Sequence, residues 1–357
     1  MAAPARATLR ERTAAALQRS WAGHGALSTA LLPAAAAFEA VAAARRQLFA
    51  RGFLESAHLP VPVIVVGNLV VGGAGKTPTT IAVVDLLRRR GYTPGIVSRG
   101  YGRRSAGVVI VAPGSSAQEV GDEPLLLQRR TSVPVAVGAD RVAAGHALLR
   151  AHPAIDVVVS DDGLQHLALE RDVEILVFDE RGGGNGRLLP AGPLRERVPN
   201  ALGPRRIALY NAAVATTPLP GYVAWRSLAG VSPLQAWWEG AAPSRPALEA
   251  LRDREIVAVA GLALPERFFA MLRAAGLRIE ERALGDHADF TTLPWPPTST
   301  DVVLTEKDAV KLPASRRIGT RVWVAPLDFV PEPAFDAALL AMLPPPSSID
   351  PNGNTPA

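Results

Sequence analysis

One glycine-rich stretch, Val61-Pro-Val-Ile-Val-Val-Gly-Asn-Leu-Val-Val-Gly-Gly-Ala-Gly-Lys-Thr-Pro78, restricts the folds open to this chain more than any other segment. Its β-branched run over 61–66 predicts a fully buried strand, and 79–88 has the apolar spacing of a helix. Glycines between a strand and a helix let successive backbone N–H groups face an anion. In such a loop Lys76 reaches the phosphates and the Thr77 hydroxyl ligates Mg²⁺.

The stretch departs from the strict pattern G-x-x-x-x-G-K-[ST], which has glycine where this chain has Val70. It is closer to the variant G-G-x-G-K-[ST], whose usual preceding lysine is replaced by Val71. The flanking strand and helix are those that phosphate binding requires. The predicted nucleotide-binding residues are Gly72, Gly73, Ala74, Gly75, Lys76, Thr77 and Pro78.

Composition narrows the classes of partner. The 357 residues are enough for two domains, and the absence of cysteine excludes disulfides and thiolate metal sites. The formal charge of +5 is carried almost entirely by arginine, since the lysines are Lys76, Lys307 and Lys311. This charge favours an anionic partner. Because no module of stacking aromatic and basic residues accompanies it, we expect an anionic membrane surface and no nucleic acid.

The N-terminal segment has an uncharged run over 20–38 that is too rich in alanine and glycine to predict a membrane-spanning helix. Phe38–Phe53 follows, with large apolar residues at helical spacing and Arg45, Arg46 and Arg51 nearby. This pattern predicts an amphipathic helix that lies in a membrane interface or packs on the protein's own core. The sequence leaves both possibilities open.

The rest of the chain alternates short apolar strands with helices, which is typical of a parallel sheet. We predict an α/β fold: a P-loop NTPase-type parallel sheet with helices on both faces, and a smaller C-terminal α/β domain. Strands at Tyr222–Trp225 and Leu234–Trp238 are expected to form a β linker between them. The expected units are an N-terminal helical segment 1–55, a P-loop core 56–215, the C-terminal domain 216–343 and a disordered tail 344–357.

Carboxylates follow two of the predicted strands or loops near the glycine-rich stretch. Asp161 and Asp162 end the apolar run 155–159, where P-loop proteins hold Mg²⁺ or its water shell. Asp122 and Glu123 precede Pro124 and a helix, so they either face the phosphate site or cap that helix. One of Asp161 and Asp162, with Thr77, is the predicted metal site.

Six segments in order make the chain resemble the tetraacyldisaccharide 4′-kinase family over roughly residues 45–330. That family's loop also lacks the first glycine, so Val70 fits it. The segments are Val66-Gly-Asn-Leu-Val-Val-Gly-Gly-Ala-Gly-Lys-Thr-Pro78, Ser98-Arg-Gly-Tyr-Gly102, Val120-Gly-Asp-Glu-Pro124, Ser160-Asp-Asp-Gly-Leu-Gln-His166, Asn185-Gly-Arg-Leu-Leu-Pro-Ala-Gly-Pro-Leu-Arg-Glu196 and Thr305-Glu-Lys-Asp-Ala-Val-Lys-Leu312.

The resemblance implies transfer of the ATP γ-phosphoryl group, with Mg²⁺, to the 4′-hydroxyl of a tetraacyldisaccharide 1-phosphate, giving lipid IVA in lipid A biosynthesis. It places the enzyme at the cytoplasmic face of the bacterial inner membrane, peripheral or monotopic, with no obligate protein partner. It implies a catalytic pair, Asp122 and His287, beside Lys76. The family's Phe-Pro-Asp-His-His motif reads Leu284-Gly-Asp-His-Ala288 here. Further active-site candidates by this resemblance are Glu123, Gln165, His166 and Glu196.

Two other functions are compatible with parts of the sequence. A membrane-associated P-loop switch ATPase acting through a protein partner fits the glycine-rich loop, but Val71 stands where such switches have a signature lysine. A soluble small-molecule kinase fits the core, but the apolar N-terminal segment argues against it. Lys307 and Lys311 either bind the substrate's 1-phosphate or stabilise the second domain.

Overall fold

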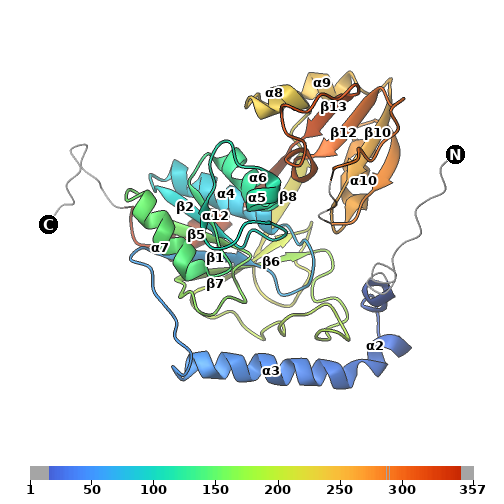
Figure 1. Cartoon of the computed structure of the whole chain (residues 1–357). Coiled ribbons are helices and arrows are strands. Elements are labelled where there is room, and N and C mark those ends of the chain that lie inside the picture. Colours follow the sequence, from blue (N-terminus) through green and yellow to red (C-terminus); the bar gives the residue numbers. More distant parts are fainter. Residues whose placement is uncertain (1–15, 287, 289, 347–357) are drawn as a thin grey trace.

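The computed structural model describes residues 16–286, 288 and 290–346. Its larger sheet, of which β1, β2, β5, β6, β7 and β8 are labelled in Figure 1, has nine strands within these residues. Their order is β14-β8-β7-β6-β1-β5-β2-β4-β3. Neighbours from β8 to β4 run parallel, and β14 and β3 are antiparallel edges. The strands are β1 (Val63–Gly67), β2 (Pro94–Ser98), β3 (Val109–Ile110), β4 (Val135–Val137), β5 (Val157–Asp161), β6 (Val173–Asp179), β7 (Arg206–Asn211), β8 (Tyr222–Leu228) and β14 (Leu327–Pro331).

Helices cover both faces of this sheet, as the sequence predicts. Helices α4 (Lys76–Arg89) and α6 (Asp122–Thr131) contact each other on one face. Helix α7 (Arg141–Ala151) leads back from β4 to β5, and right-handed crossovers therefore place it on the opposite face. Because both faces are covered, β1, β2 and β5 are buried along their whole length, as their continuous apolar runs require. The short α5 (Ala117–Val120) precedes α6, and α12 (Pro333–Leu340) packs near β7.

A second sheet has five strands among the described residues, in the order β11-β10-β12-β13-β9. All neighbours except β13 and β9 are parallel. The strands are β9 (Ser232–Pro233), β10 (Glu255–Ala260), β11 (Arg278–Ala283), β12 (Asp301–Thr305) and β13 (Arg321–Ala325). The helices are α8 (Leu234–Trp238), α9 (Arg245–Glu249), α10 (Pro265–Ala274) and α11 (Glu306–Ala309).

Two adjacent strands connect the sheets, since β8 and β14 pair antiparallel at the edge of the larger sheet. The range 216–343, predicted as one C-terminal unit, thus contributes β8, β14 and α12 to the larger sheet. The predicted strand Leu234–Trp238 is wrong, because these residues form α8. Pro233 precedes that helix, and the Trp237 indole is buried and donates to Glu306 over 3.1 Å. Tertiary packing of the two tryptophans overrides their preference for strands.

The N-terminal segment contains α2 (Ala26–Ala30) and the 19-residue α3 (Leu32–Ala50), which includes most of the predicted amphipathic helix. Figure 1 shows α3 running along one side of the molecule, outside the layers of the larger sheet. Ala35 is its one buried residue, whereas Val41 is 71% and the following Phe53 is 73% exposed. Across the described ranges, the helices are all too short or too polar to cross a bilayer. The predicted disordered tail lies outside the described residues from 347 onward.

Candidate active site

The glycine-rich loop joins β1 to α4 in the layout that the sequence predicts. Gly75 is the N-cap of α4 with a φ of +97°, and a Cβ there would lie 2.2 Å from the Asn211 amide nitrogen. That amide donates to the Ala74 carbonyl over 3.1 Å. Only glycine therefore allows the close approach that holds this turn.

The Lys76 ammonium is held on the inside of the loop. It donates to the Asn68 side-chain oxygen over 3.2 Å and to the Gly72 carbonyl over 3.4 Å. The Asn68 amide donates to the same carbonyl over 3.0 Å, so these groups fix the lysine's direction. A carboxylate oxygen of Asp162 lies 3.8 Å from the ammonium. Lysine and aspartate therefore form an ion pair beside the loop where a triphosphate would lie.

The two strand-end aspartates have different environments. Asp161 is buried, and its Oδ1 accepts from the Thr80 hydroxyl over 2.9 Å. Burial raises the pKa of Asp161 to about 7, and repulsion from Glu123 and Asp162 adds to this effect. Asp162 has a φ of +50° and is 33% exposed at its side chain. It lies on the cavity side, within 3.4 Å of Arg195.

Thr77 and Asp162 are the two predicted metal ligands that line the cavity. One hydroxyl and one carboxylate fit Mg²⁺, which takes few protein ligands and completes its shell with phosphate oxygens and water. No cluster of three or more histidine or acidic side chains suited to a metal occurs among the described residues. Asp161, the third predicted ligand, is buried and is not part of the cavity lining.

Asp122 and Glu123 lie in the first turn of α6, the helix that contacts α11 of the smaller sheet's domain. Asp122 is 6% exposed, its Oδ1 accepts from the Glu123 backbone N–H over 2.9 Å, and the Lys311 ammonium lies 3.9 Å from its Oδ2. Glu123 accepts from Lys307 over 2.9 Å, and Lys307 also donates to Asp286. Burial opposes the charge of Lys307, but these carboxylates outweigh it and raise its pKa.

The two lysines of the 305–312 motif thus contact the acidic first turn of α6 and residues of their own domain. In this structure they pair with protein carboxylates, which supports the expectation that they stabilise the second domain against the first. His287, the other member of the predicted catalytic pair, lies outside the described residues.

Gln165, His166 and Glu196 lie near Asp162. The Gln165 amide nitrogen donates to Glu196 over 3.2 Å, and its oxygen accepts from Arg195 over 3.2 Å. Burial and nearby arginines lower the pKa of His166 to about 4, so its ring is neutral at pH 7. Its Nε2 accepts from the Arg141 backbone N–H at the start of α7. His166 therefore helps to hold the start of α7 in place beside the site.

A cavity of about 1110 Å³ brings most of the predicted residues together. Its lining includes Gly72, Gly73, Gly75, Lys76, Thr77, Pro78, Glu123, Asp162, Gln165 and His166. Residues of the second sheet's domain, such as Phe268 and Lys307, also line this cavity. Four predicted residues, Ala74, Asp122, Asp161 and Glu196, are not part of this lining, although each adjoins a residue that is.

Sequence reasoning missed several polar residues that hold the site. Asn68 and Asn211 orient the loop, and Arg195 pairs with Asp162. Arg181 donates to two carbonyls of the glycine-rich loop. Asp179, at the end of β6, could have been found by the rule that identified Asp161, because strand ends of a parallel sheet point at the ligand.

Together these features define a P-loop nucleotide-binding protein with phosphotransferase chemistry: a glycine-rich loop on a parallel sheet, with a lysine, a hydroxyl and a strand-end carboxylate facing one cavity. Residues 27–344 match the sequence profile of the tetraacyldisaccharide-1-P 4′-kinase family. The chain belongs to this family, and it is a kinase.

Individual relatives of known name belong to the same family. The chain is 54% identical over 347 residues to tetraacyldisaccharide 4′-kinase of Methylibium petroleiphilum, covering 96% of this chain and 97% of the relative. It is 55% identical over 338 residues to the enzyme of the same name from Leptothrix cholodnii, covering 94% and 97%. The crystal structure of an "apo" form of LpxK from Aquifex aeolicus in complex with ATP matches with a TM-score of 0.73 and 30% identity, over 89% of this chain and all of that chain.

Proposed function

We propose that in this cavity the protein transfers the γ-phosphoryl group of Mg-ATP to the 4′-hydroxyl of a tetraacyldisaccharide 1-phosphate. This acceptor is a lipid A precursor, and the product is lipid IVA. The observation that carries the proposal is the convergence of Lys76, Thr77 and Asp162 on one cavity, with the Asp122–Glu123 turn at its border. The names of the family and the relatives supply the acceptor.

Each residue has a physical role in this proposal. Phosphoryl transfer needs positioning and charge neutralisation more than covalent chemistry. Lys76 would neutralise the phosphates, and Thr77 with Asp162 would hold Mg²⁺, which would supply further positive charge for the phosphates. Asp122 would accept the proton of the sugar hydroxyl, with His287 of the same predicted pair orienting it.

The first prediction concerns activity. With acceptor lipid in detergent micelles and labelled ATP, the protein is expected to produce a phosphorylated lipid that chromatography resolves, and this product should depend on Mg²⁺. Omission of the lipid should stop most ATP consumption, because the proposed base then has no acceptor hydroxyl to deprotonate. ATP hydrolysis that is indifferent to the lipid would favour the switch ATPase instead.

We further propose a site of action at an anionic membrane, the cytoplasmic face of the bacterial inner membrane, with α3 in its interface. The acyl chains of the acceptor lie in lipid while ATP comes from water, so the enzyme must work at the boundary. Exposed Val41, Leu48 and Phe53 with neighbouring Arg45 and Arg46 give this segment an apolar surface and a positive charge. The glycine loop near Asn185 holds the chain just before α3, since that amide donates to the Gly23 carbonyl and to Ser28 of α2.

The second prediction tests this segment. Binding to anionic liposomes should weaken with salt, because each arginine contributes about 1 kcal/mol that is screened within a Debye length. Val41→Glu with Phe53→Glu should release the protein from sedimenting liposomes. The matched control is Val214→Glu with Trp225→Glu, which changes exposed apolar residues elsewhere and should leave binding intact. If both double variants bind the liposomes equally well, α3 does not lie in the membrane interface.

A further inference from the structure

A buried carboxylate lies behind the glycine-rich loop, at the end of β6. Asp179 is 0% exposed, and its two carboxylate oxygens accept from the Arg181 Nε over 3.1 and 3.0 Å. A terminal nitrogen of the same guanidinium lies 2.8 Å from the Asp179 Oδ2. The arginine is therefore fixed in direction by two points of contact, as a planar fork requires.

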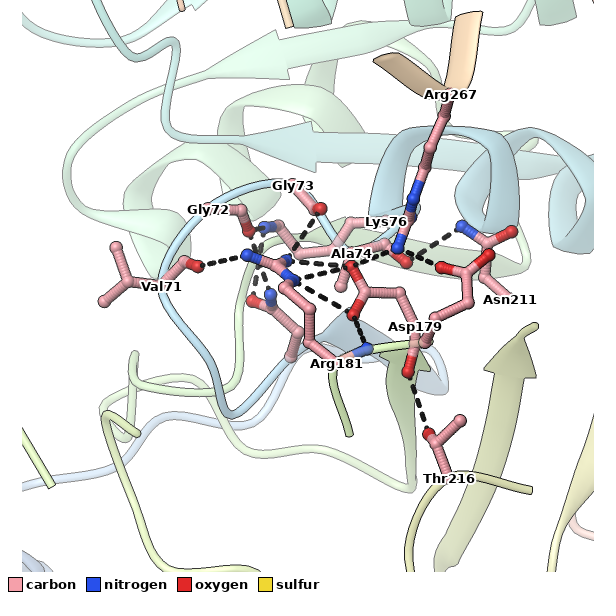
Figure 2. Close-up of polar contacts among 12 residues, drawn as sticks. Val71, Gly72, Gly73, Ala74, Lys76, Asp179, Arg181, Asn211, Thr216 and Arg267 are labelled. Carbon is pink, nitrogen blue, oxygen red and sulfur yellow. Dashed lines mark hydrogen bonds and ion pairs between the residues drawn. The ribbon is translucent and has the colours of Figure 1, made fainter. Parts of the chain in front are cut away.

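The same guanidinium holds the outside of the loop. Its terminal nitrogens donate to the Gly73 carbonyl over 3.0 Å and to the Val71 carbonyl over 3.4 Å, as Figure 2 shows. Asn211 holds the next carbonyl, that of Ala74. A phosphate-binding loop functions when its N–H groups point inward, and carbonyls held on the outside keep the peptide units turned that way.

On its other side Asp179 meets the smaller sheet's domain. Arg267 of α10 places a terminal nitrogen 3.4 Å from the Asp179 Oδ2, as Figure 2 shows. Arg267 also pairs with Glu180. Glu180 in turn accepts from Arg226 of β8 over 2.8 Å. The loop before α10 is close as well, since a Cβ on Gly72 would lie 3.6 Å from that of Ala263. One carboxylate thus links the phosphate loop with the helix that covers the cavity.

We propose that Asp179 is a positioning residue for nucleotide binding, which acts by joining Arg181 on the phosphate loop to Arg267 on α10. The inference rests on the proposed nucleotide site and adds a coupling between the two sheets. Docking of α10 on Asp179 fixes Arg181, and Arg181 fixes the loop that receives the phosphates. Binding of the triphosphate is then favoured in the arrangement in which both arginines share this carboxylate.

The direction in which one substitution changes the affinity for ATP separates a positioning role from a purely electrostatic one. Asp179→Asn removes a negative charge near the phosphate site and leaves Arg181 without a carboxylate partner, while Arg267 keeps Glu180, so charge alone predicts tighter ATP binding. Loss of the fork that orients Arg181 predicts weaker binding. A merely structural role predicts a lower melting temperature with unchanged affinity.

Equilibrium binding of Mg-ATP to the full chain tests the proposal. We expect Asp179→Asn to raise the Kd about tenfold with kcat at saturating ATP changed less than about threefold. The matched control is Glu180→Gln, because Glu180 also pairs with Arg267 but is 49% exposed and does not pair with Arg181. The Kd of this variant for Mg-ATP should differ from that of wild type by less than about twofold. Tighter or unchanged binding by Asp179→Asn would overturn the proposal.

A double-mutant cycle covers the case in which Asp179→Asn does not fold. Arg181→Ala and Arg267→Ala change partly exposed side chains, at 32% and 21%. If Arg267 acts through the shared carboxylate, its removal should have little further effect once Arg181 is absent, a non-additivity of at least about threefold in Kd. Additive effects would mean that Arg267 meets the nucleotide independently. Wild-type protein that fails to bind Mg-ATP would instead refute the nucleotide site itself.

Discussion

Asp122→Asn is expected to lower turnover of the lipid by about 10²–10⁴-fold, the usual contribution of a general base. Asparagine has the same shape and cannot take the hydroxyl proton, while its side-chain oxygen still accepts from the Glu123 backbone N–H as Asp122 does now. The Kd for Mg-ATP should remain within about threefold of wild type, because the phosphate loop is on another element. Steady-state kinetics with the lipid acceptor and equilibrium ATP binding measure the two quantities.

The control is the neighbouring carboxylate. Glu123→Gln should cost less than about fivefold in turnover, because Glu123 pairs with Lys307 and so holds the two domains together. Near-normal turnover by Asp122→Asn would show that this carboxylate only caps α6. A large loss in Glu123→Gln alone would transfer the role of base to Glu123, which lines the cavity.

Local patterns were sufficient to predict the parallel centre of the larger sheet and its glycine-rich loop. Continuous apolar runs such as 61–66 predicted strands buried on both faces, and the structure places β1 at the centre of the parallel strands. The turn depends on glycines that the sequence displays directly, as Gly75 demonstrates with its positive φ. Short-range geometry of this kind is encoded within a few residues.

Other features depend on contacts that no local pattern contains. The sequence left Asp161 and Asp162 equivalent, and the structure distinguishes them because Thr80 of α4 covers the first while a positive φ turns the second toward the cavity. The edge strand β14 was missed because its pairing with β8 follows a whole intervening domain. Arg267 gave no signal either, since its significance arises only where α10 meets Asp179.

Lys76→Met is expected to lower kcat by about 10²–10³-fold, the usual effect of removing one preorganised group that stabilises charge in a transition state. It should also weaken ATP binding, unlike Asp122→Asn, because the ammonium meets the phosphates before and during transfer. The comparison variant is Lys76→Arg. The ammonium now lies between the Asn68 oxygen at 3.2 Å and the Gly72 carbonyl at 3.4 Å, and its side chain is only 11% exposed. This space fits a compact ammonium.

A planar guanidinium would have to displace Asn68, and we therefore expect Lys76→Arg to recover less than a tenth of wild-type kcat although it keeps the charge. Single-turnover and steady-state measurements at saturating ATP separate this loss from weaker binding. Full recovery by arginine would mean that a positive charge anywhere near the loop is sufficient. A methionine variant with unchanged kcat would mean that Lys76 binds the ground state and transition state equally, and charge stabilisation would then have to come from Mg²⁺ and the surrounding arginines.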